Sequence, residues 1–426
     1  MDLVNRVRRS PAALLGTGPS RLLVSASLAG SIGLGMYGSG SLLFFTRVQH
    51  LSIAQVGSGL SIAAVVALLV GIPAGRAADV VGARRMVVGA GLLQAVLLCA
   101  ALTTGSSYPL YLVVMCLLGA AKQAEQVARG AVVATVCTAD ERVEVQARMR
   151  SVFNIGVTVG ILLAGAATAW DTRAAYAGLM VANAVTAVCA AGIIMRLPAT
   201  AGRPRGAASG DRWEALRDYP YLAVAVLCGF VAIADAALTV GLPLWVVDYT
   251  SAPRPVGVWL LAVNTVLISL FQVWASRGAK TAEGARRLLR RSCAATAAAC
   301  FVFVFAAWVP AVPAVLALVV AVGVLTLGEL WGSAAAWFLR YSLAKEGAQG
   351  EYGGVFGLAT GIPAMLGPGM VTFMMTEWRG WSWVAVGVLG LLAAAVSPSV
   401  LRRAETAKAV RERVPVDVAA VPAAAG

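Results

Sequence analysis

Long apolar runs alternate with short polar segments along the chain, and this pattern predicts its secondary structure. Twelve runs have the length of roughly 17 to 25 residues that crosses the hydrocarbon core of a bilayer as a helix. The predicted spans are 22–46, 55–75, 86–104, 110–136, 149–170, 174–195, 221–247, 256–276, 292–309, 312–339, 353–375 and 381–400. Because unpaired backbone polar groups are not tolerated in lipid, runs of this length must be helical. The predicted fold class is an all-α membrane protein with twelve transmembrane helices.

The fourth predicted span breaks the apolar pattern. Lys122, Glu125, Gln126 and Arg129 lie at i, i+3, i+4 and i+7, and we call them the span 4 stripe. Helical geometry places all four side chains on one face. Ionisable groups at membrane depth are costly and usually face protein or a water-filled path, so the stripe predicts movement of a solute across a membrane. The alternative is that Glu125 and Arg129 only neutralise each other as an i,i+4 pair, which Lys122 joins.

Composition supports the lipid bilayer as the protein's surroundings. The 426 residues are 59% hydrophobic and 13% charged, whereas soluble domains carry about 25% charged residues. Of the 34 basic residues, 28 fall in segments on one side of the predicted spans and four on the other. Cytoplasmic loops are enriched in Lys and Arg, so both termini are predicted to be cytoplasmic. Arg outnumbers Lys 30 to 4, a bias typical of GC-rich bacteria, which indicates a bacterial plasma membrane.

Several function classes are not expected. The net charge of +14 is spread over seven loop segments that follow the topology, so nucleic acid is not an expected partner. The seven cysteines lie in or beside the spans without metal-ligand spacing, and no metal or cofactor is expected. The single histidine, His50, lies in a predicted loop, and no nucleophile–base set is evident, so the chain is not expected to be an enzyme.

The chain is predicted to divide into two six-helix halves. The polar residues 198–219 form a linker between residues 1–197 and 220–402, and residues 403–426 form a cytoplasmic tail. The sequence Gly82-Ala83-Arg84-Arg85 after the second span recurs as Gly284-Ala285-Arg286-Arg287 after the eighth. Loops on the same side that are related in this way indicate a parallel repeat about an axis normal to the membrane.

The loop after the second span carries a recognisable motif. It has Gly75, Asp79, Gly82, Arg84 and Arg85 at the positions of the signature of the major facilitator superfamily, from which Val80 departs. With the twelve spans and the central linker, the chain resembles this superfamily over essentially its whole length. Two further stretches resemble the sequences of exporter-like members from actinobacteria. They are Gly328-Glu329-Leu330-Trp331 and Pro243-Leu244-Trp245. The resemblance implies two pseudo-repeat halves around a central cavity lined by spans 1, 4, 7 and 10.

The resemblance also implies roles for individual residues. Asp79 is expected to latch the cytoplasmic side in the outward-facing state, through the N-terminus of span 11 near Gly353 and through Arg129. Independently of the resemblance, Gly367 and Pro368 with their neighbouring glycines predict a hinge in span 11.

The embedded ionisable residues fall in the spans that the family places around its cavity. Besides the span 4 stripe they are Asp235 in span 7 and Glu329 in span 10. Neither has a basic partner in its own span, so both are candidate proton or cation sites. The alternative is that both only partner the basic residues of span 4.

Three functions follow as hypotheses. The first is proton-coupled export of small apolar or amphiphilic compounds, such as drugs or secondary metabolites, by a monomer that works by alternating access. The runner-up is a proton-coupled uptake symporter for a small nutrient, which needs more convergent polar groups than spans 1, 7 and 10 offer. The Gly-Pro motif that antiporters of the family often carry in span 5 is absent, which counts against antiport. The third is a non-transporting sensor or scaffold, which has no use for costly buried charges.

Overall fold

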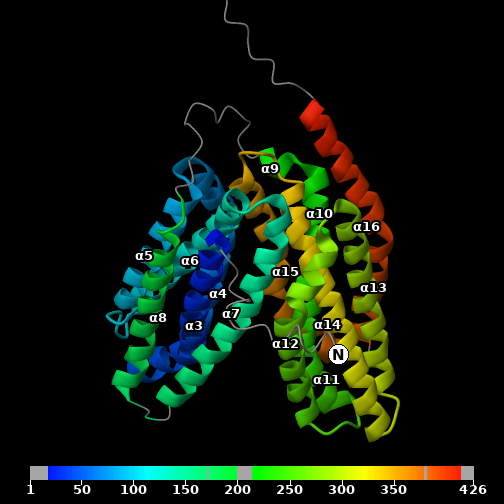
Figure 1. Ribbon diagram of the computed structural model, residues 1–426. Coiled ribbons are helices and arrows are strands. Elements are labelled where there is room, and N and C mark those ends of the chain that lie inside the picture. The colour runs from blue at the N-terminus through cyan, green and yellow to red at the C-terminus, as the bar shows by residue number, and fades with distance from the viewer. Residues whose placement is uncertain (1–17, 169, 171, 199–213, 379–380, 414–426) are drawn as a thin grey trace, which may run out of the picture.

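The computed structural model describes residues 18–168, 170, 172–198, 214–378 and 381–413 (Figure 1). Within these ranges the chain is helical and contains no strand. The all-helical fold class is therefore confirmed. Residues 199–213 of the predicted linker and 414–426 of the predicted tail lie outside the described residues.

Two groups of helices follow each other along the chain (Figure 1). The first group contains α3 (Gly18–Leu43) with the π-helix η1 (Phe44–Val48), α4 (Ile53–Val81), α5 (Ala83–Ala101), α6 (Tyr108–Val136), α7 (Ala139–Thr168) and α8 (Arg173–Ile194). The second contains α9 (Glu214–Arg217), α10 (Tyr219–Ala236), the π-helix η2 (Ala237–Gly241), α11 (Leu242–Tyr249), α12 (Pro255–Ser276), η3 (Arg277–Ala279), α13 (Ala282–Ala306), α14 (Ala311–Ser342), α15 (Gln349–Glu377) and α16 (Trp381–Arg413).

Most of these helices are long and apolar enough to cross a membrane. Among the described residues nine pass a test of length and hydropathy, and eleven pass if each of two bent helix pairs counts as one span. Helix α6 has 29 residues but is not among them, because the span 4 stripe lowers its hydropathy. With α6 included, each of the twelve predicted spans corresponds to one helix or one continuous run of helices, as in a multi-pass membrane protein.

Small residues allow close packing within the first group. A Cβ atom added at Gly35 of α3 would meet the backbone carbonyl of Val157 in α7, and one at Gly160 would meet that of Ile32. Helices in lipid gain little from the hydrophobic effect between them, so close backbone approach is a main source of their association. The glycines at 156 and 160 thus allow α3 and α7 to pack closely.

Aromatic clusters fill the core of each group. In the second group the Trp245 indole donates to the carbonyl of Phe303 at 2.8 Å, and Trp383 packs on the Phe303 ring at a centroid distance of 4.5 Å. In the first group Phe45 meets Tyr111 edge to face at 4.7 Å. Each aromatic pair contributes about 0.5–1.5 kcal/mol to stability beyond the burial of its rings. Because both partners of a pair belong to the same group, these pairs stabilise each group internally and do not join the two groups.

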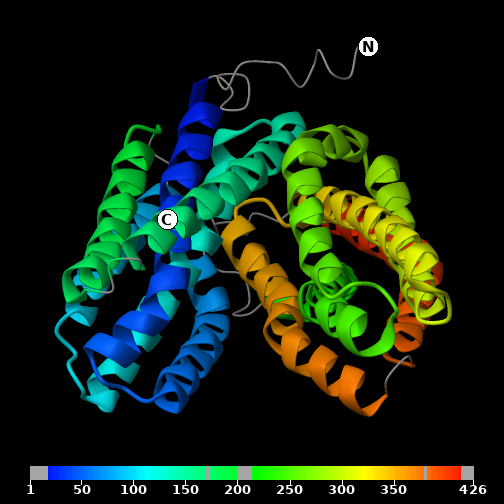
Figure 2. The same ribbon diagram turned by 90° about the horizontal axis from the view of Figure 1, so that it is seen from below.

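The two groups meet near one end of the molecule. Helices α4 and α6 pack against α15, and α7 packs against α12 and α14. We call the end that carries the α4–α5 turn at Gly82 and the last turn of α16 the basic end. From there the groups diverge, as the side view shows (Figure 1), and the view from below shows the two groups next to each other (Figure 2).

Several helices extend beyond their predicted limits, among them α7, α14 and α16. Helix α7 begins at Ala139 and not at residue 149, α14 ends at Ser342, and α16 continues to Arg413. The predicted limits were wrong because an apolar run stops where charged residues begin, whereas a helix continues wherever its backbone and surface allow. Arg142 and Arg148, which precede the predicted span 149–170, therefore lie within α7 together with Arg150.

Helix α15 is bent. Its segments Gln349–Gly367 and Gly369–Met375 meet at an angle of 42°. The bend coincides with Gly367 and Pro368, where a kink was expected from the Gly and Pro content. Whether the bend works as a hinge stays a prediction.

Candidate functional site

The span 4 stripe lines a cavity of about 440 Å³ in the first group. Helices α3, α5, α6, α7 and α8 form most of its wall, and Trp337 and Arg340 of α14 close one side. All four stripe residues, Lys122, Glu125, Gln126 and Arg129, face this cavity. The volume lies within the range of roughly 300–1,000 Å³ that is typical of small-molecule sites.

Glu125 is well partnered in the structure. It forms an ion pair with Arg129 one turn further along α6, and its other carboxylate oxygen accepts a hydrogen bond from the Gln94 amide at 2.8 Å. This is the self-neutralising i,i+4 pair that the sequence offers as one interpretation. Glu125 and Arg129 therefore contribute polar surface to the cavity but no net charge.

Lys122 does not join that pair. Its ammonium group lies 4.0 Å from the centroid of the Tyr37 ring in α3, a cation–π contact. Among the described residues no carboxylate oxygen lies within 4.0 Å of the ammonium nitrogen. The stripe thus presents one cation to the cavity that no carboxylate neutralises directly.

Glu329 pairs across the two groups. Its side chain is 7% exposed and forms an ion pair with Arg150 of α7. The alternative that Glu329 partners a basic residue of span 4 is wrong, because its partner lies at the start of the predicted span 149–170. Asp235 of α10 is close enough to Arg150 and Glu329 to interact electrostatically with both. One arginine of the first group therefore faces two carboxylates of the second.

More polar groups line the cavity than the sequence predicts. The additional ones lie outside the predicted spans 1, 4, 7 and 10, and they are Gln94 of α5, Gln146 and Arg150 of α7, and Asn183 of α8. Gln146 also donates to the Tyr341 hydroxyl at 2.5 Å. Gln94 and Asn183 interrupt otherwise apolar runs, which is the signal that could have revealed them. Arg340 and Gln146 lie outside the predicted spans and gave no such signal.

Asp79 lies at the basic end, between the two groups. Its carboxylate accepts hydrogen bonds from the backbone N–H groups of Gly350 at 2.8 Å and Glu351 at 2.9 Å. These belong to the first turn of α15, where free N–H groups and the helix dipole stabilise an anion. The contact lies three residues before the expected Gly353, and the other expected partner, Arg129, pairs with Glu125.

The remaining motif residues shape the same region. Gly75 packs against Gly350, and a Cβ atom there would clash with the Gly350 carbonyl. Gly82, with a φ of 100°, allows the turn between α4 and α5. Arg84 donates to the carbonyl of Leu197 at 2.5 Å, and Arg85 is exposed.

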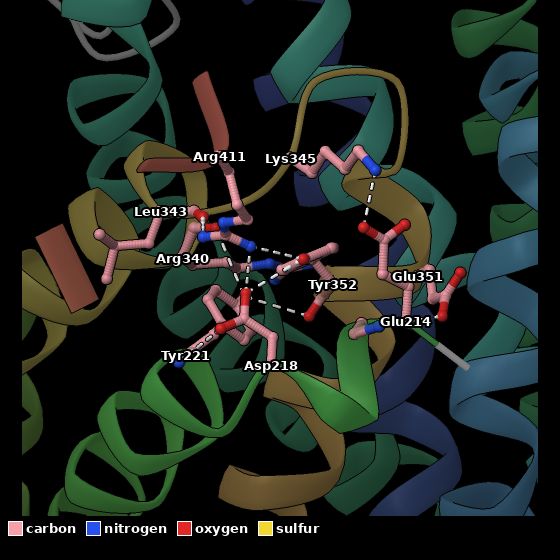
Figure 3. Close-up of polar contacts among 10 residues, drawn as sticks. Glu214, Asp218, Tyr221, Arg340, Leu343, Lys345, Glu351, Tyr352 and Arg411 are labelled. Atoms are coloured by element: carbon pink, nitrogen blue, oxygen red, sulfur yellow. Dashed lines mark hydrogen bonds and ion pairs between the residues drawn. The ribbon is translucent and has the colours of Figure 1, made fainter. Parts of the chain in front are cut away.

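A polar network holds the start of α15 from its other side (Figure 3). Arg411 of α16 pairs with the Asp218 carboxylate and donates to the Tyr352 hydroxyl at 2.8 Å. The Tyr352 hydroxyl in turn donates to Asp218 at 3.0 Å. Next to it, Lys345 pairs with Glu214 of α9 at 2.6 Å. We call Asp218, Tyr352 and Arg411 the α16 clamp.

The sequence matches the family model of the Major Facilitator Superfamily over residues 23–368. The chain belongs to this superfamily. A comparison of the sequence with curated proteins finds no match. The exporter-like resemblance therefore stays a prediction, while a secondary transporter of the major facilitator superfamily is supported by the family and by the fold.

Solved structures of superfamily transporters resemble this one. A bacterial homologue of the iron transporter ferroportin in an outward-facing state is 14% identical, with a TM-score of 0.71 over 92% of this chain and 100% of that one. FucP in the outward conformation is 16% identical, with a TM-score of 0.68 over 91% and 98%. The proton:xylose symporter XylE is 13% identical, with a TM-score of 0.63 over 90% and 96%. At these identities the likeness shows the fold.

Proposed function

We propose that this protein is a proton-coupled transporter that takes up a small polar solute by alternating access. The basic end faces the cytoplasm in this proposal, with both termini there, in a bacterial plasma membrane. The observation that carries it is the ion pair between Arg150 and Glu329, because it joins the two helix groups next to a polar cavity.

The ion pair links proton binding to movement of the groups. Opening the basic end requires α7 and α14 to separate, which would leave the carboxylate of Glu329 without its partner. Breaking a buried ion pair by losing one partner is strongly unfavourable. A proton on Glu329 removes that charge, so the protonated protein opens inward more easily. Asp235 is the second carboxylate near Arg150 and the alternative carrier of the proton.

The polarity of the cavity favours uptake over export of apolar compounds. An uptake symporter needs convergent polar groups, and α5, α7 and α8 supply them in addition to α6. XylE, which shares the fold, is described as a proton:xylose symporter. Export of small apolar or amphiphilic compounds is the second candidate, favoured by the exporter-like residues around Glu329.

Transport in proteoliposomes tests this proposal. Purified protein would face an inward proton gradient, with a panel of labelled sugars, amino acids, carboxylates and phosphate esters, and with lipophilic dyes for the export candidate. We expect the proton gradient to drive accumulation of a polar solute, and Glu329→Gln to abolish this accumulation. The matched variant Glu144→Gln should preserve it, because Glu144 pairs with Arg148 within α7 and does not join the two groups. Gradient-driven flux of the dyes alone would favour export, and no flux of any compound would refute both.

A further inference from the structure

We infer that the solute carried by this protein is a small organic anion, held in the cavity between Lys122 and Arg340. The inference rests on the proposed transport function for its physiological meaning, but the charges that carry it are independent of proton coupling. Lys122 belongs to α6 and Arg340 to α14, so an anion between them would contact both helix groups.

Arg340 is a guanidinium without an acidic partner. Among the described residues no hydrogen bond or ion pair of the guanidinium is found, and its Nε atom is buried without a hydrogen-bond partner. It lies against two residues that lack side chains, Gly130 of α6 and Gly353 of α15, and 5.5 Å from the centroid of the Tyr341 ring. Figure 3 shows it beside the α16 clamp, whose carboxylate is bound by Arg411.

The charges around the cavity do not balance. Four basic side chains line it, Lys122, Arg129, Arg150 and Arg340. Glu125 neutralises Arg129, and Glu329 neutralises Arg150. Asp235 lies near Arg150 and Glu329 and neutralises at most one further positive charge. At least one of the four positive charges therefore has no carboxylate to balance it. A charge that is partly removed from water without an opposite charge beside it is costly, and an anionic ligand would reduce that cost.

The spacing and the other lining groups limit the ligand. Arg340 lies beside Gly130, eight residues from Lys122 along α6, which corresponds to about 12 Å of helix. The cavity of about 440 Å³ lies in the lower part of the range of roughly 300–1,000 Å³ for ligand sites, which limits the ligand to a small molecule. The amides of Gln126 and Asn183 also face it and suit hydroxyl or carbonyl groups. These features fit a small carboxylate or phosphate ester with further polar groups.

Ligand-induced thermal stabilisation of the purified full-length protein tests this inference. At constant ionic strength the probes are lactate, citrate, glycerol 3-phosphate and glucuronate, with glycerol and glucose as neutral analogues and choline as a cation. We expect stabilisation by at least one anion and by no neutral analogue. Lys122→Gln and Arg340→Gln should each weaken the apparent affinity at least ten-fold. Lys122→Arg should largely preserve it, as should Arg287→Gln, which removes an exposed arginine outside the cavity.

The outcomes separate this inference from the proposed function. Equal stabilisation by anions and neutral analogues, unchanged affinity in both glutamine variants, or no response to any anion would overturn the inference. If anions bind through Lys122 and Arg340 but drive no proton flux in proteoliposomes, the anion site stands and proton coupling is wrong. If a neutral solute moves with protons and anions neither bind nor compete, proton coupling stands and the anion site is wrong.

Discussion

The carboxylate of Asp79 in α4 accepts a hydrogen bond of 2.8 Å from the backbone N–H of Gly350, the second residue of α15. A second bond from Glu351 makes the contact bidentate. It joins a loop-side residue of the first helix group to the N-terminus of a helix in the second. The two partners must separate whenever the basic end opens.

Asp79→Asn is expected to weaken closure of the basic end. The amide keeps an acceptor oxygen but loses the negative charge that the helix N-terminus stabilises, at a cost of about 1 kcal/mol. The open population should rise about five-fold. Spin labels at Met195 and Arg402, exposed residues on the two groups, would report this as a longer distance in a variant without native cysteines. An unchanged distance distribution would show that the contact does not control closure.

Gly75→Ala is expected to disturb closure more than Asp79→Asn does. The added Cβ would clash with the backbone carbonyl of Gly350, which cannot rotate away as a side chain can. Gly89→Ala is the matched control, because the same Cβ at Gly89 of α5 would meet open space. The same pair of spin labels checks both variants, and equal behaviour of the two would contradict a requirement for close approach at Gly75.

Arg411→Ala is expected to destabilise the protein by about 1–3 kcal/mol, as for the loss of a hydrogen bond to a charged group. The Asp218 side chain is 8% exposed and would keep only the hydrogen bonds from Tyr352 and its own helix N-terminus. Thermal unfolding measures the effect. Arg403→Ala, an exposed arginine of the same helix, should leave the unfolding temperature unchanged, and an equal loss in both variants would exclude a specific clamp.

Arg150→Gln is expected to destabilise the protein by about 2 kcal/mol, because it leaves the buried carboxylate of Glu329 without its ion-pair partner. The double variant Arg150→Gln/Glu329→Gln removes both charges and should recover most of that stability without recovering proton-driven transport. Thermal unfolding and proteoliposome flux together check this. Additive losses of stability would indicate that the two side chains do not interact energetically.

Hydropathy and one motif were enough to predict the fold and the contact between Asp79 and the start of span 11. The structure shows why glycines stand at Gly75 and Gly156, because a Cβ atom at either position would clash with the helix packed beside it. Asp79 was placed near the start of span 11 by resemblance, and the structure puts it within three residues of the expected contact.

The partners of the embedded charges were not predictable in the same way. Arg150 and Arg340 lie at the limits of the predicted apolar runs 149–170 and 312–339, where the hydropathy pattern stops and gives no indication of what a side chain contacts. Their burial depends on how far α7 and α14 continue and on what packs beside them. Those are tertiary properties, and no local pattern of residues encodes them.

The polar face of α6 also has a consequence for how the chain enters the bilayer. The described helices that pass the hydropathy test number eleven at most, an odd number that would put the two ends of the chain on opposite sides. With Lys122, Glu125 and Arg129 in its middle, α6 is a poor substrate for insertion on its own. The hydrogen bond from Gln94 of α5 to Glu125 covers one of these charges. We therefore expect α5 and α6 to leave the translocon together as a hairpin. The residues that make the cavity polar would then also make membrane insertion of α6 depend on α5.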